Sequence, residues 1–209
     1  METPSSVLTP LQLYKLMSGS IVPRPIGWIS TLSVAGVPNL APFSYFNAVS
    51  SDPPTLMFSS GMREARQPKD TIRNVLDTGE FVVNIVTFEL APAMNITAAD
   101  APPDASEFEL AGVTPVPARA VGVPRVLESP IHFECRLVHT YDAGSNIVVF
   151  GRIEHIHVAD ELLIDGEKID IVRLEPIGRL AGSGYARIRE LFAMVRPSYA
   201  DSVVQGDDP

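Results

Sequence analysis

The stretch from Asn39 to Ser50 reads NLAPFSYFNAVS and carries aromatic residues on both faces of an extended chain. Successive side chains of a strand point to opposite sides, so this pattern predicts a strand buried on both faces. Asp52-Pro53-Pro54 ends the strand, because two prolines cannot continue a ladder of hydrogen bonds. The segments on either side, Ile26 to Val34 and Thr55 to Ser60, are also rich in strand-forming residues, and a turn is expected over residues 35–38.

A helix is predicted over Asp70 to Thr78, where apolar residues recur at helical spacing. Asp70 is the expected N-cap, and Gly79 is the residue expected to end the helix. Beyond it, Phe81 to Val86 predicts a buried strand. Glu89 to Ala99 predicts a second helix with Pro92 in its first turn.

The segment from Ala101 to Pro124 is rich in proline, alanine and acidic residues, and we expect it to run over the surface. It is not interpreted as a domain boundary, because strands resume after it. Ile131 to Tyr141 and Ile147 to Val158 predict a hairpin around residues 142–146, and Leu162 to Ile164 a further short strand.

Six or more predicted strands with few helices indicate one mainly β domain over residues 1–209, folded as a β-barrel. The chain contains 19 prolines spread along its length, which is typical of many short elements joined by stiff turns. The acidic tail, residues 201–209, is expected to fray.

The formal net charge of −9 gives no general basic surface for nucleic acid. Cys135 is the single cysteine, which excludes a disulfide within the chain and a CxxC redox pair. Electron transfer by this chain would therefore need a cofactor or a metal. Met1 to Thr9 lacks the pattern of a secretory signal, and no apolar run approaches the roughly 20 residues that span a bilayer. A cytoplasmic protein without a membrane segment is expected.

Polar residues occur where a strand scaffold ordinarily places apolar ones. Arg24 lies between two prolines, whose stiff loop could present the guanidinium to a phosphate. On those three residues alone, an exposed surface arginine is the favoured interpretation. Ser44, Asn47 and Ser50 lie inside the aromatic strand, where buried polar groups need partners. A flavin ring and neighbouring backbone groups could supply those partners equally well.

Ser59-Ser60-Gly61 and Lys69-Asp70-Thr71 come just before the predicted helix and at its start. Free amides and the positive end of the dipole make a helix N-terminus a natural phosphate site. Lys69 adds a positive charge and Thr71 a hydroxyl. Asp70 would compete with an anion if it capped the helix itself, so this signal is weak alone.

Several linked motifs occur in one order along the chain. They are Arg24 to Thr31 (RPIGWIST), Asn39 to Ser50, Asp52-Pro53-Pro54, Lys69-Asp70-Thr71 with Asn74, Gly79 to Asn84 (GEFVVN), Val149-Phe150-Gly151 and Arg179 to Gly182 (RLAG). Together they resemble the flavin reductase-like, FMN-binding split-barrel family, especially its flavoredoxin-like branch. The resemblance spans roughly Ser20 to Tyr185 and implies a Greek-key split β-barrel.

The resemblance also implies a homodimer with one FMN near each subunit interface. In such an arrangement residues 24–31 and 43–50 line the isoalloxazine ring and ribityl chain, and Ser59, Ser60, Lys69 and Thr71 hold the phosphate. The implied cofactor-binding residues are Arg24, Thr31, Pro42, Phe43, Ser44, Asn47, Ala48, Ser50, Ser59, Ser60, Lys69 and Thr71. Ala181 departs from the family, in which two glycines commonly follow the Arg-Leu pair. Its methyl group narrows the backbone approach to the flavin or to a partner subunit and leaves the role of Gly182 to Tyr185 open.

The implied function is an FMN-dependent oxidoreductase in which NADH or NADPH passes hydride to the flavin for an oxygenase or another acceptor. No side chain need act as acid or base, so no catalytic residue is assigned, and catalysis rests on proximity and exclusion of water. The sequence lacks a GxGxxG fingerprint, so the nicotinamide would bind on the flavin surface. The alternative is a non-catalytic electron carrier that serves a protein partner.

A third hypothesis keeps the barrel and changes the ligand to a deazaflavin or haem. His155 and His157 lie two residues apart on a predicted strand and so share a face, as metal ligands do. No third ligand has a clear spacing, and a solvated strand face is the favoured interpretation, with no metal site. Cys135 is interpreted as a small core residue.

Overall fold

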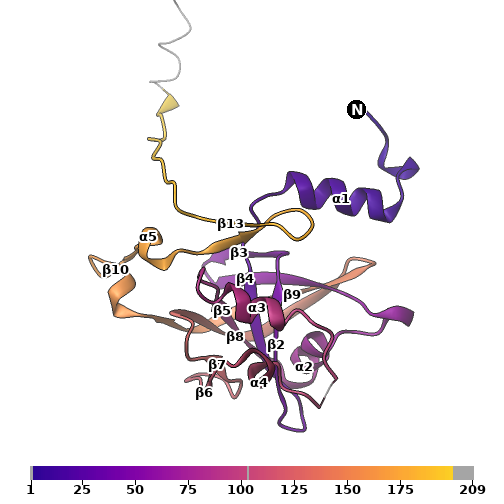
Figure 1. Ribbon diagram of the computed structural model, residues 1–209, viewed down its shortest axis with the longest axis horizontal. Coiled ribbons are helices and arrows are strands. Elements are labelled where there is room, and N and C mark those ends of the chain that lie inside the picture. The colour runs from indigo at the N-terminus through magenta and orange to yellow at the C-terminus, as the bar shows by residue number, and fades with distance from the viewer. Residues whose placement is uncertain (1, 103, 200–209) are drawn as a thin grey trace, which may run out of the picture.

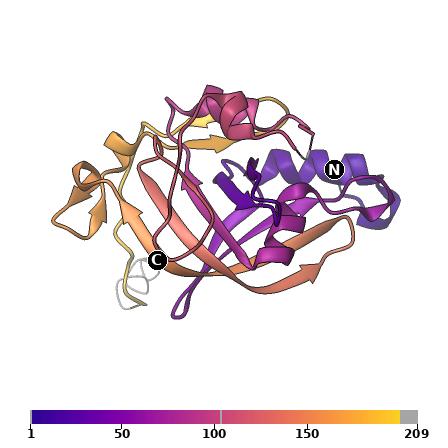
Figure 2. The ribbon, with the colours of Figure 1, turned by 90° about the horizontal axis from the view of Figure 1, so that it is seen from below.

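The computed structural model describes residues 2–102 and 104–199, and the predicted frayed tail lies outside the described residues. Its main element is a seven-stranded antiparallel sheet in the order β2-β1-β5-β8-β9-β4-β3. These strands are β1 (Gly27–Leu32), β2 (Pro38–Phe43), β3 (Phe46–Ser51), β4 (Pro54–Gly61), β5 (Glu80–Ile85), β8 (Ile131–Asp142) and β9 (Asn146–Val158). The sheet curls strongly, as Figure 2 shows. The predicted mainly β fold is confirmed.

The remaining elements are short. The helices are α1 (Pro10–Ser20), α2 (Asp70–Thr78), α3 (Ala91–Ile96), α4 (Glu107–Ala111) and α5 (Ile171–Leu174), with 3-10 turns at Ser5–Val7, Glu64–Arg66 and Asp160–Leu162. Three small ribbons pair β6 (Pro115–Val116) with β7 (Arg125–Val126), β10 (Leu163–Ile164) with β11 (Lys168–Ile169), and β12 (Ile177–Arg179) with β13 (Tyr185–Arg187). Figure 1 shows α1 projecting from one side of the body and α3 and α4 beside β2.

The core is divided between the inside of the curled sheet and its outer layer. Inside, the rings of Phe43, Phe58 and Phe81 follow one another at centroid distances of 5.0 and 5.3 Å. Outside, Trp28 packs with residues of α3 and α4 and donates a hydrogen bond from Nε1 to Thr97 Oγ1 at 2.9 Å. β1 and β2 contribute residues to both clusters, and β2 also lines part of the candidate site.

The stretch 39–50 forms two strands rather than one. β2 ends at Phe43, the chain bends at Ser44 and Tyr45, and β3 begins at Phe46. Residues 47–51 of β3 are exposed, so the prediction of burial on both faces is wrong for this half. The reason is position, because β3 is an edge strand that pairs with β4 alone.

Helix α2 has the predicted bounds, and Gly79 ends it in the left-handed conformation at φ 72°. The prediction that Asp70 is the N-cap is wrong: Lys69 occupies that position, and no side chain caps the helix. The Asp70 carboxylate is instead paired with Arg63 and Arg73. The second predicted helix is present as α3, shorter than expected and with Pro92 in its first turn.

Residues 101–124 do more than cross the surface, and that prediction is corrected. Phe108, Val121 and Val123 are buried, because this segment brings α4 against β2 and then covers the outer face of the sheet. Glu134 holds the covering segment by accepting hydrogen bonds from the backbone amides of Arg119 and Ala120.

Contacts with the neighbouring strand β8 change the interpretation of the histidine pair. His155 is half-buried, with Nδ1 3.6 Å from Glu134 Oε1, and the ring of His157 lies 5.2 Å from that of buried His132. This is not a solvated strand face. Within the described residues, no three His, Cys, Asp or Glu side chains are grouped to hold a metal ion. Cys135 is buried in the core, as predicted.

Helix α1 was not predicted, although its start carries a recognisable signal. Thr9 and Gln12 form a reciprocal capping box, and Pro10 occupies the first turn. Only Ser18 of this helix is buried, so its weak amphipathic pattern gave no sign of it. No helix in the part of the chain that the structure describes is long and apolar enough to cross a membrane.

Candidate functional site

Three adjoining cavities form one long groove across the ends of β2 and β4. Their volumes are about 100, 220 and 160 Å³, taken from the α2 end to the far end. The first two share Pro42, Phe43 and Lys69, and the last two share Arg24, Ser44 and Tyr14. We call this continuous depression the flavin groove, after the ligand that the sequence resemblance implies.

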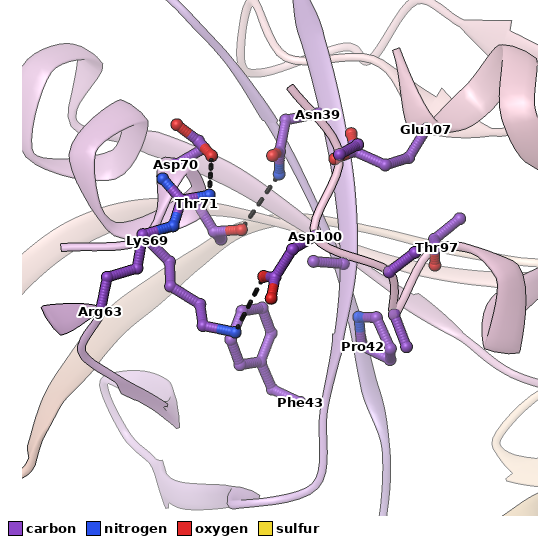
Figure 3. Close-up of a pocket in the computed structure, with 14 residues that line it drawn as sticks. Asn39, Pro42, Phe43, Arg63, Lys69, Asp70, Thr71, Thr97, Asp100 and Glu107 are labelled. Atoms are coloured by element: carbon purple, nitrogen blue, oxygen red, sulfur yellow. Dashed lines mark hydrogen bonds and ion pairs between the residues drawn. The ribbon is translucent and has the colours of Figure 1, made fainter. Parts of the chain in front are cut away.

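The N-terminus of α2 lies at one end of the flavin groove (Figure 3). Asn39 Nδ2 donates to Thr71 Oγ1 at 3.0 Å and fixes that hydroxyl. Lys69 Nζ lies 3.5 Å from Asp100 Oδ1, and both side chains are substantially exposed. Because no side chain caps α2, the amides of its first turn remain available to a ligand.

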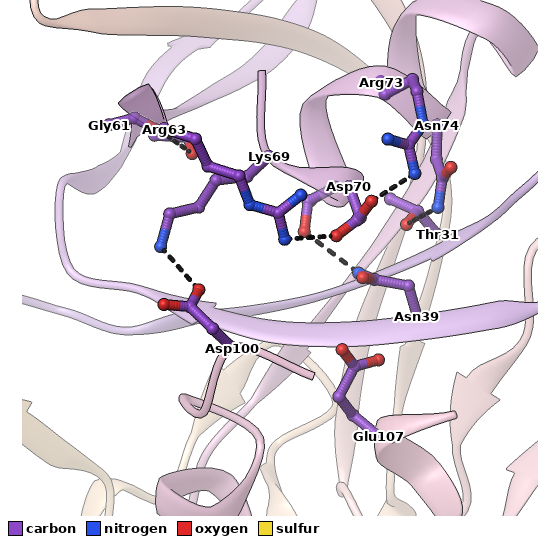
Figure 4. Close-up of polar contacts among 12 residues, drawn as sticks. Thr31, Asn39, Gly61, Arg63, Lys69, Asp70, Arg73, Asn74, Asp100 and Glu107 are labelled. Atoms are coloured by element: carbon purple, nitrogen blue, oxygen red, sulfur yellow. Dashed lines mark hydrogen bonds and ion pairs between the residues drawn. The ribbon is translucent and has the colours of Figure 1, made fainter. Parts of the chain in front are cut away.

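Asp70 does not leave an uncompensated negative charge at this end. Its carboxylate lies 2.6 Å from Arg63 Nη2 and is also paired with Arg73 (Figure 4). Partial burial acts to raise the pKa of Asp70, but the hydrogen bonds and charges of the two arginines outweigh it, so its pKa lies below the usual value. The competition between Asp70 and an anion is thereby removed.

Glu107 is the second carboxyl group in this wall, and it is only 8% exposed. Burial raises its pKa, the hydrogen bond that Oε2 accepts from the Leu40 amide at 3.1 Å opposes that rise, and the charge of Asp70 adds to it. Because the folded protein then holds the proton more tightly than the unfolded chain, the contribution of Glu107 to stability falls as pH rises above its usual pKa of 4.5.

We therefore expect Glu107→Gln to gain stability relative to the parent protein as pH rises from 4.5 towards 8. Glutamine keeps an oxygen for the Leu40 amide and removes the ionisation. Urea denaturation at steps across this range measures the difference. Exposed Glu109 on the same helix provides the control Glu109→Gln for loss of one negative charge. If the two variants gained stability equally as pH rises, the result would contradict the conclusion that burial raises the pKa of Glu107.

Arg24 lies at the middle of the groove but is 6% exposed, so the interpretation as a surface arginine is wrong. Its guanidinium donates to Ser18 O at 2.6 Å, Ile21 O at 3.2 Å, Leu180 O at 3.1 Å and Ser44 Oγ at 3.3 Å. These bonds join α1, the loop after β12 and the bend between β2 and β3. The two flanking prolines could not reveal this, because Leu180 is distant in the sequence.

At the far end, Tyr14 of α1 and Tyr185 of β13 line the groove, together with Arg179. The Arg179 guanidinium carbon lies 4.5 Å from the centroid of the Tyr185 ring. None of these three was predicted as a site residue. Tyr14 follows the capping box of α1, and Tyr185 is the last residue of the segment, Gly182 to Tyr185, whose role the sequence left open.

The predicted site residues fall into three groups. Those that line the flavin groove are Arg24, Pro42, Phe43, Ser44, Ser59, Ser60, Lys69 and Thr71. Thr31 is fully buried and accepts a hydrogen bond from Asn74 Nδ2 at 3.1 Å. Asn47, Ala48 and Ser50 lie on exposed β3, outside the cavities. A ligand role for any of the twelve residues stays a prediction.

The strand order and the strong curl of the antiparallel sheet define a split-barrel protein. A solved structure with a split barrel domain from Shewanella frigidimarina superimposes with a TM-score of 0.82 over 94% of this chain and 100% of its own, at 21% identity. Residues 17–169 match the flavin reductase like domain family, and the chain belongs to that family. The resemblance noted from the sequence is confirmed.

Two further solved structures are more similar in sequence. Nitrilotriacetate monooxygenase component B from Bacillus cereus is 39% identical, covers 93% of this chain and 98% of its own, and has a TM-score of 0.88. The 2-nitrobenzoate 2-nitroreductase of Pseudomonas fluorescens is 31% identical, covers 95% and 98%, and has a TM-score of 0.86. These likenesses and the family support an oxidoreductase that is a flavoprotein.

Proposed function

We propose that this protein binds FMN in the flavin groove and transfers hydride to it from NADH or NADPH, so that the reduced flavin serves a second acceptor. The observation that carries the proposal is the composition of the groove. It offers anion-binding groups at the α2 end, an apolar wall in the middle and aromatic side chains at the far end.

The α2 end suits a phosphate monoester. Ser59 and Ser60 line the groove beside Lys69. Ser59 Oγ accepts a hydrogen bond from Asn146 Nδ2 at 3.0 Å, which leaves its own proton to donate. The Ser59 hydroxyl, the open amides of α2 and the Lys69 charge form a donor set of the kind that phosphates take at helix N-termini, whereas Ser60 Oγ already donates to Gly61 O at 3.1 Å.

The middle of the groove suits a planar ring. Pro42 and Phe43 supply the apolar wall, and Arg24 holds Ser44 at its edge. FMN, when bound, supplies the two-electron acceptor chemistry, while the chain orients both ligands and excludes water. No side chain is required to move a proton in a hydride step, so we assign none as catalytic.

Anaerobic absorbance spectra test the proposal directly. The purified protein is saturated with FMN and mixed separately with NADH and NADPH. Bleaching of the oxidised flavin by at least one nicotinamide, much faster than for free FMN, is the expected result. Tight FMN binding without bleaching by either nicotinamide would exclude the reductase, and no binding of FMN would exclude the whole proposal.

Lys69→Ala should weaken FMN binding by about 10-fold, because one charge-assisted hydrogen bond to phosphate is worth about 1.5 kcal/mol. Riboflavin, which lacks the phosphate, should bind the variant and the parent protein equally. Flavin fluorescence quenching measures both affinities. Lys168→Ala on exposed β11 is the matched control for loss of a positive charge. Equal weakening of riboflavin binding would place Lys69 elsewhere than at the phosphate.

Component B of a monooxygenase is among the similar structures, so we propose an oxygenase component as the acceptor. We also propose a homodimer as the working unit, because the family resemblance of the sequence implies one. The second candidate function is an electron carrier without nicotinamide turnover. The net charge of −9 favours this electron carrier, because a negatively charged surface attracts a basic redox partner. Sustained oxidation of nicotinamide by the protein and FMN alone would count against the carrier.

A further inference from the structure

The chain leaves the body after β13 as an extended arm, which we define as residues 188–197. The arm contains no helix, strand or turn. Its apolar side chains are largely open to water: Leu191 is 55% exposed, Phe192 87%, Met194 83% and Val195 94%. Figure 1 shows this segment running away from the sheet. Folded proteins rarely expose so many large apolar side chains in one stretch unless the stretch contacts another surface.

The body carries a surface of matching character. A cleft of about 570 Å³ lies between α3 and the ribbon of β12 and β13. Its walls include Phe88, Ala91, Pro92, Ile177 and Ala186, with Glu89 and Arg187 also lining it. The Arg187 guanidinium carbon lies 3.9 Å from the centroid of the Phe88 ring and extends the wall. We call this surface the apolar cleft.

The arm does not fill the apolar cleft of its own chain. Along β13, Tyr185 contacts Asn95 and Arg187 lies over Phe88, so the chain traverses the cleft from one end to the other. It then leaves beyond Phe88, where the Ile188 amide donates to Pro176 O at 3.1 Å and Arg189 pairs with Glu175 at 3.3 Å. A return to the cleft would need a reversal of direction, and the arm has no turn.

We propose that the arm of one copy of this chain lies in the apolar cleft of a second copy, and that the exchange is reciprocal. Ten extended residues reach up to about 33 Å, enough to cross onto a neighbouring molecule. A two-fold axis uses the same pair of surfaces twice, which doubles the buried apolar area. The inference rests on the homodimer proposed above and assigns the segments that join it.

Charge supports a second copy as the occupant. Arg196 lies on the arm and Glu89 lies in the wall of the cleft. Neither forms an ion pair within residues 2–102 and 104–199. An arm that entered the cleft of another copy would bring these opposite charges to the same interface.

Sedimentation equilibrium of the full chain tests the contribution of the arm. We expect a dimer whose dissociation constant rises by about 900-fold in Phe192→Ser, because reciprocal exchange loses two interface anchors worth about 2 kcal/mol each. Leu127→Ser removes an exposed apolar side chain outside the arm and cleft and is the control. Arg196→Glu should weaken the dimer, and Glu89→Arg combined with it should restore the association.

Cysteine cross-linking tests where the arm goes. Met194→Cys places a thiol on the arm and Ala91→Cys places one in the cleft, while Cys135 is fully buried and its pKa is raised by burial, so it stays unreactive. On mixing the two single variants, oxidation should give a disulfide-linked pair of chains. Leu127→Cys mixed with Met194→Cys should give none.

In a chain that carries both Ala91→Cys and Met194→Cys, a cross-link confined to that one chain would overturn the proposal, as would a monomeric full chain. A dimer with an unchanged dissociation constant in Phe192→Ser would also overturn it, while leaving the homodimer standing. FMN affinity measured on the same variants reports separately on the flavin groove, so failure of the arm exchange and failure of the proposed function remain distinguishable.

Discussion

Replacing Arg24 by alanine should lower the free energy of unfolding by about 3 to 5 kcal/mol and abolish tight FMN binding. The guanidinium is buried and serves three backbone carbonyl groups and the Ser44 hydroxyl. Truncation leaves those carbonyl groups without donors, and each buried unsatisfied group costs about 1–3 kcal/mol. It also frees α1 and the bend at Ser44, which form two walls of the flavin groove.

Urea denaturation and flavin titration together measure this effect. Arg24→Lys should lose less stability, because an ammonium group supplies donors but not the planar fork that serves four acceptors at once. Exposed Arg152, which pairs with Glu154, gives the control Arg152→Ala, with an expected change within about 0.5 kcal/mol. A variant at position 24 that kept full stability and lost only FMN affinity would show that Arg24 contacts the ligand rather than organising its walls.

Gly151→Ala should destabilise the protein by about 3 kcal/mol, although alanine ordinarily suits a strand at least as well as glycine. A methyl group at Gly151 would lie 2.6 Å from Phe81 Cε1 and 3.3 Å from Cys135 Cβ. Phe81 is fully buried and packs edge-on against Phe58, so its ring has no room to retreat. The contact explains why glycine stands in the segment Val149-Phe150-Gly151.

Thermal and urea denaturation measure the loss. Gly19→Ala in α1 is the control, because its added methyl would meet only Ala181 Cβ at 4.0 Å, and its effect should be neutral or a gain of about 0.5 kcal/mol. Combining Gly151→Ala with Phe81→Leu should cost less than the sum of the two single changes. Strict additivity would place the strain somewhere other than the Phe81 ring.

The sequence correctly predicted those elements whose structure depends on residues close together in the chain. The hairpin of β8 and β9, the bounds of α2 and its glycine stop each depend on residues within one segment, and each is confirmed. The exposure of β3 depends on its place at the edge of the sheet, which no property of residues 46–51 encodes. The burial of Phe108 likewise depends on a contact between α4 and β2.

The candidate site likewise contains residues that local sequence predicts and residues that only distant contacts bring to the groove. Lys69, Thr71 and the two serines before them were predicted because a helix N-terminus is visible in sequence, and the structure places them along one groove. The role of Arg24 could not be read, since its partner Leu180 lies 156 residues away. Tyr14 and Tyr185 reach the groove from opposite ends of the chain for the same reason.

The strand order also determines when each strand can pair with its neighbours during synthesis of the chain. β4 pairs with β3, which is adjacent in sequence, and with β9, which ends at Val158. A chain emerging from the ribosome therefore holds a β3–β4 hairpin whose second neighbour has not yet been synthesised. During that interval the edge of β4 that pairs with β9 in the finished protein has no partner strand. The nascent chain thus presents an unpaired strand edge to chaperones until most of the protein has been translated.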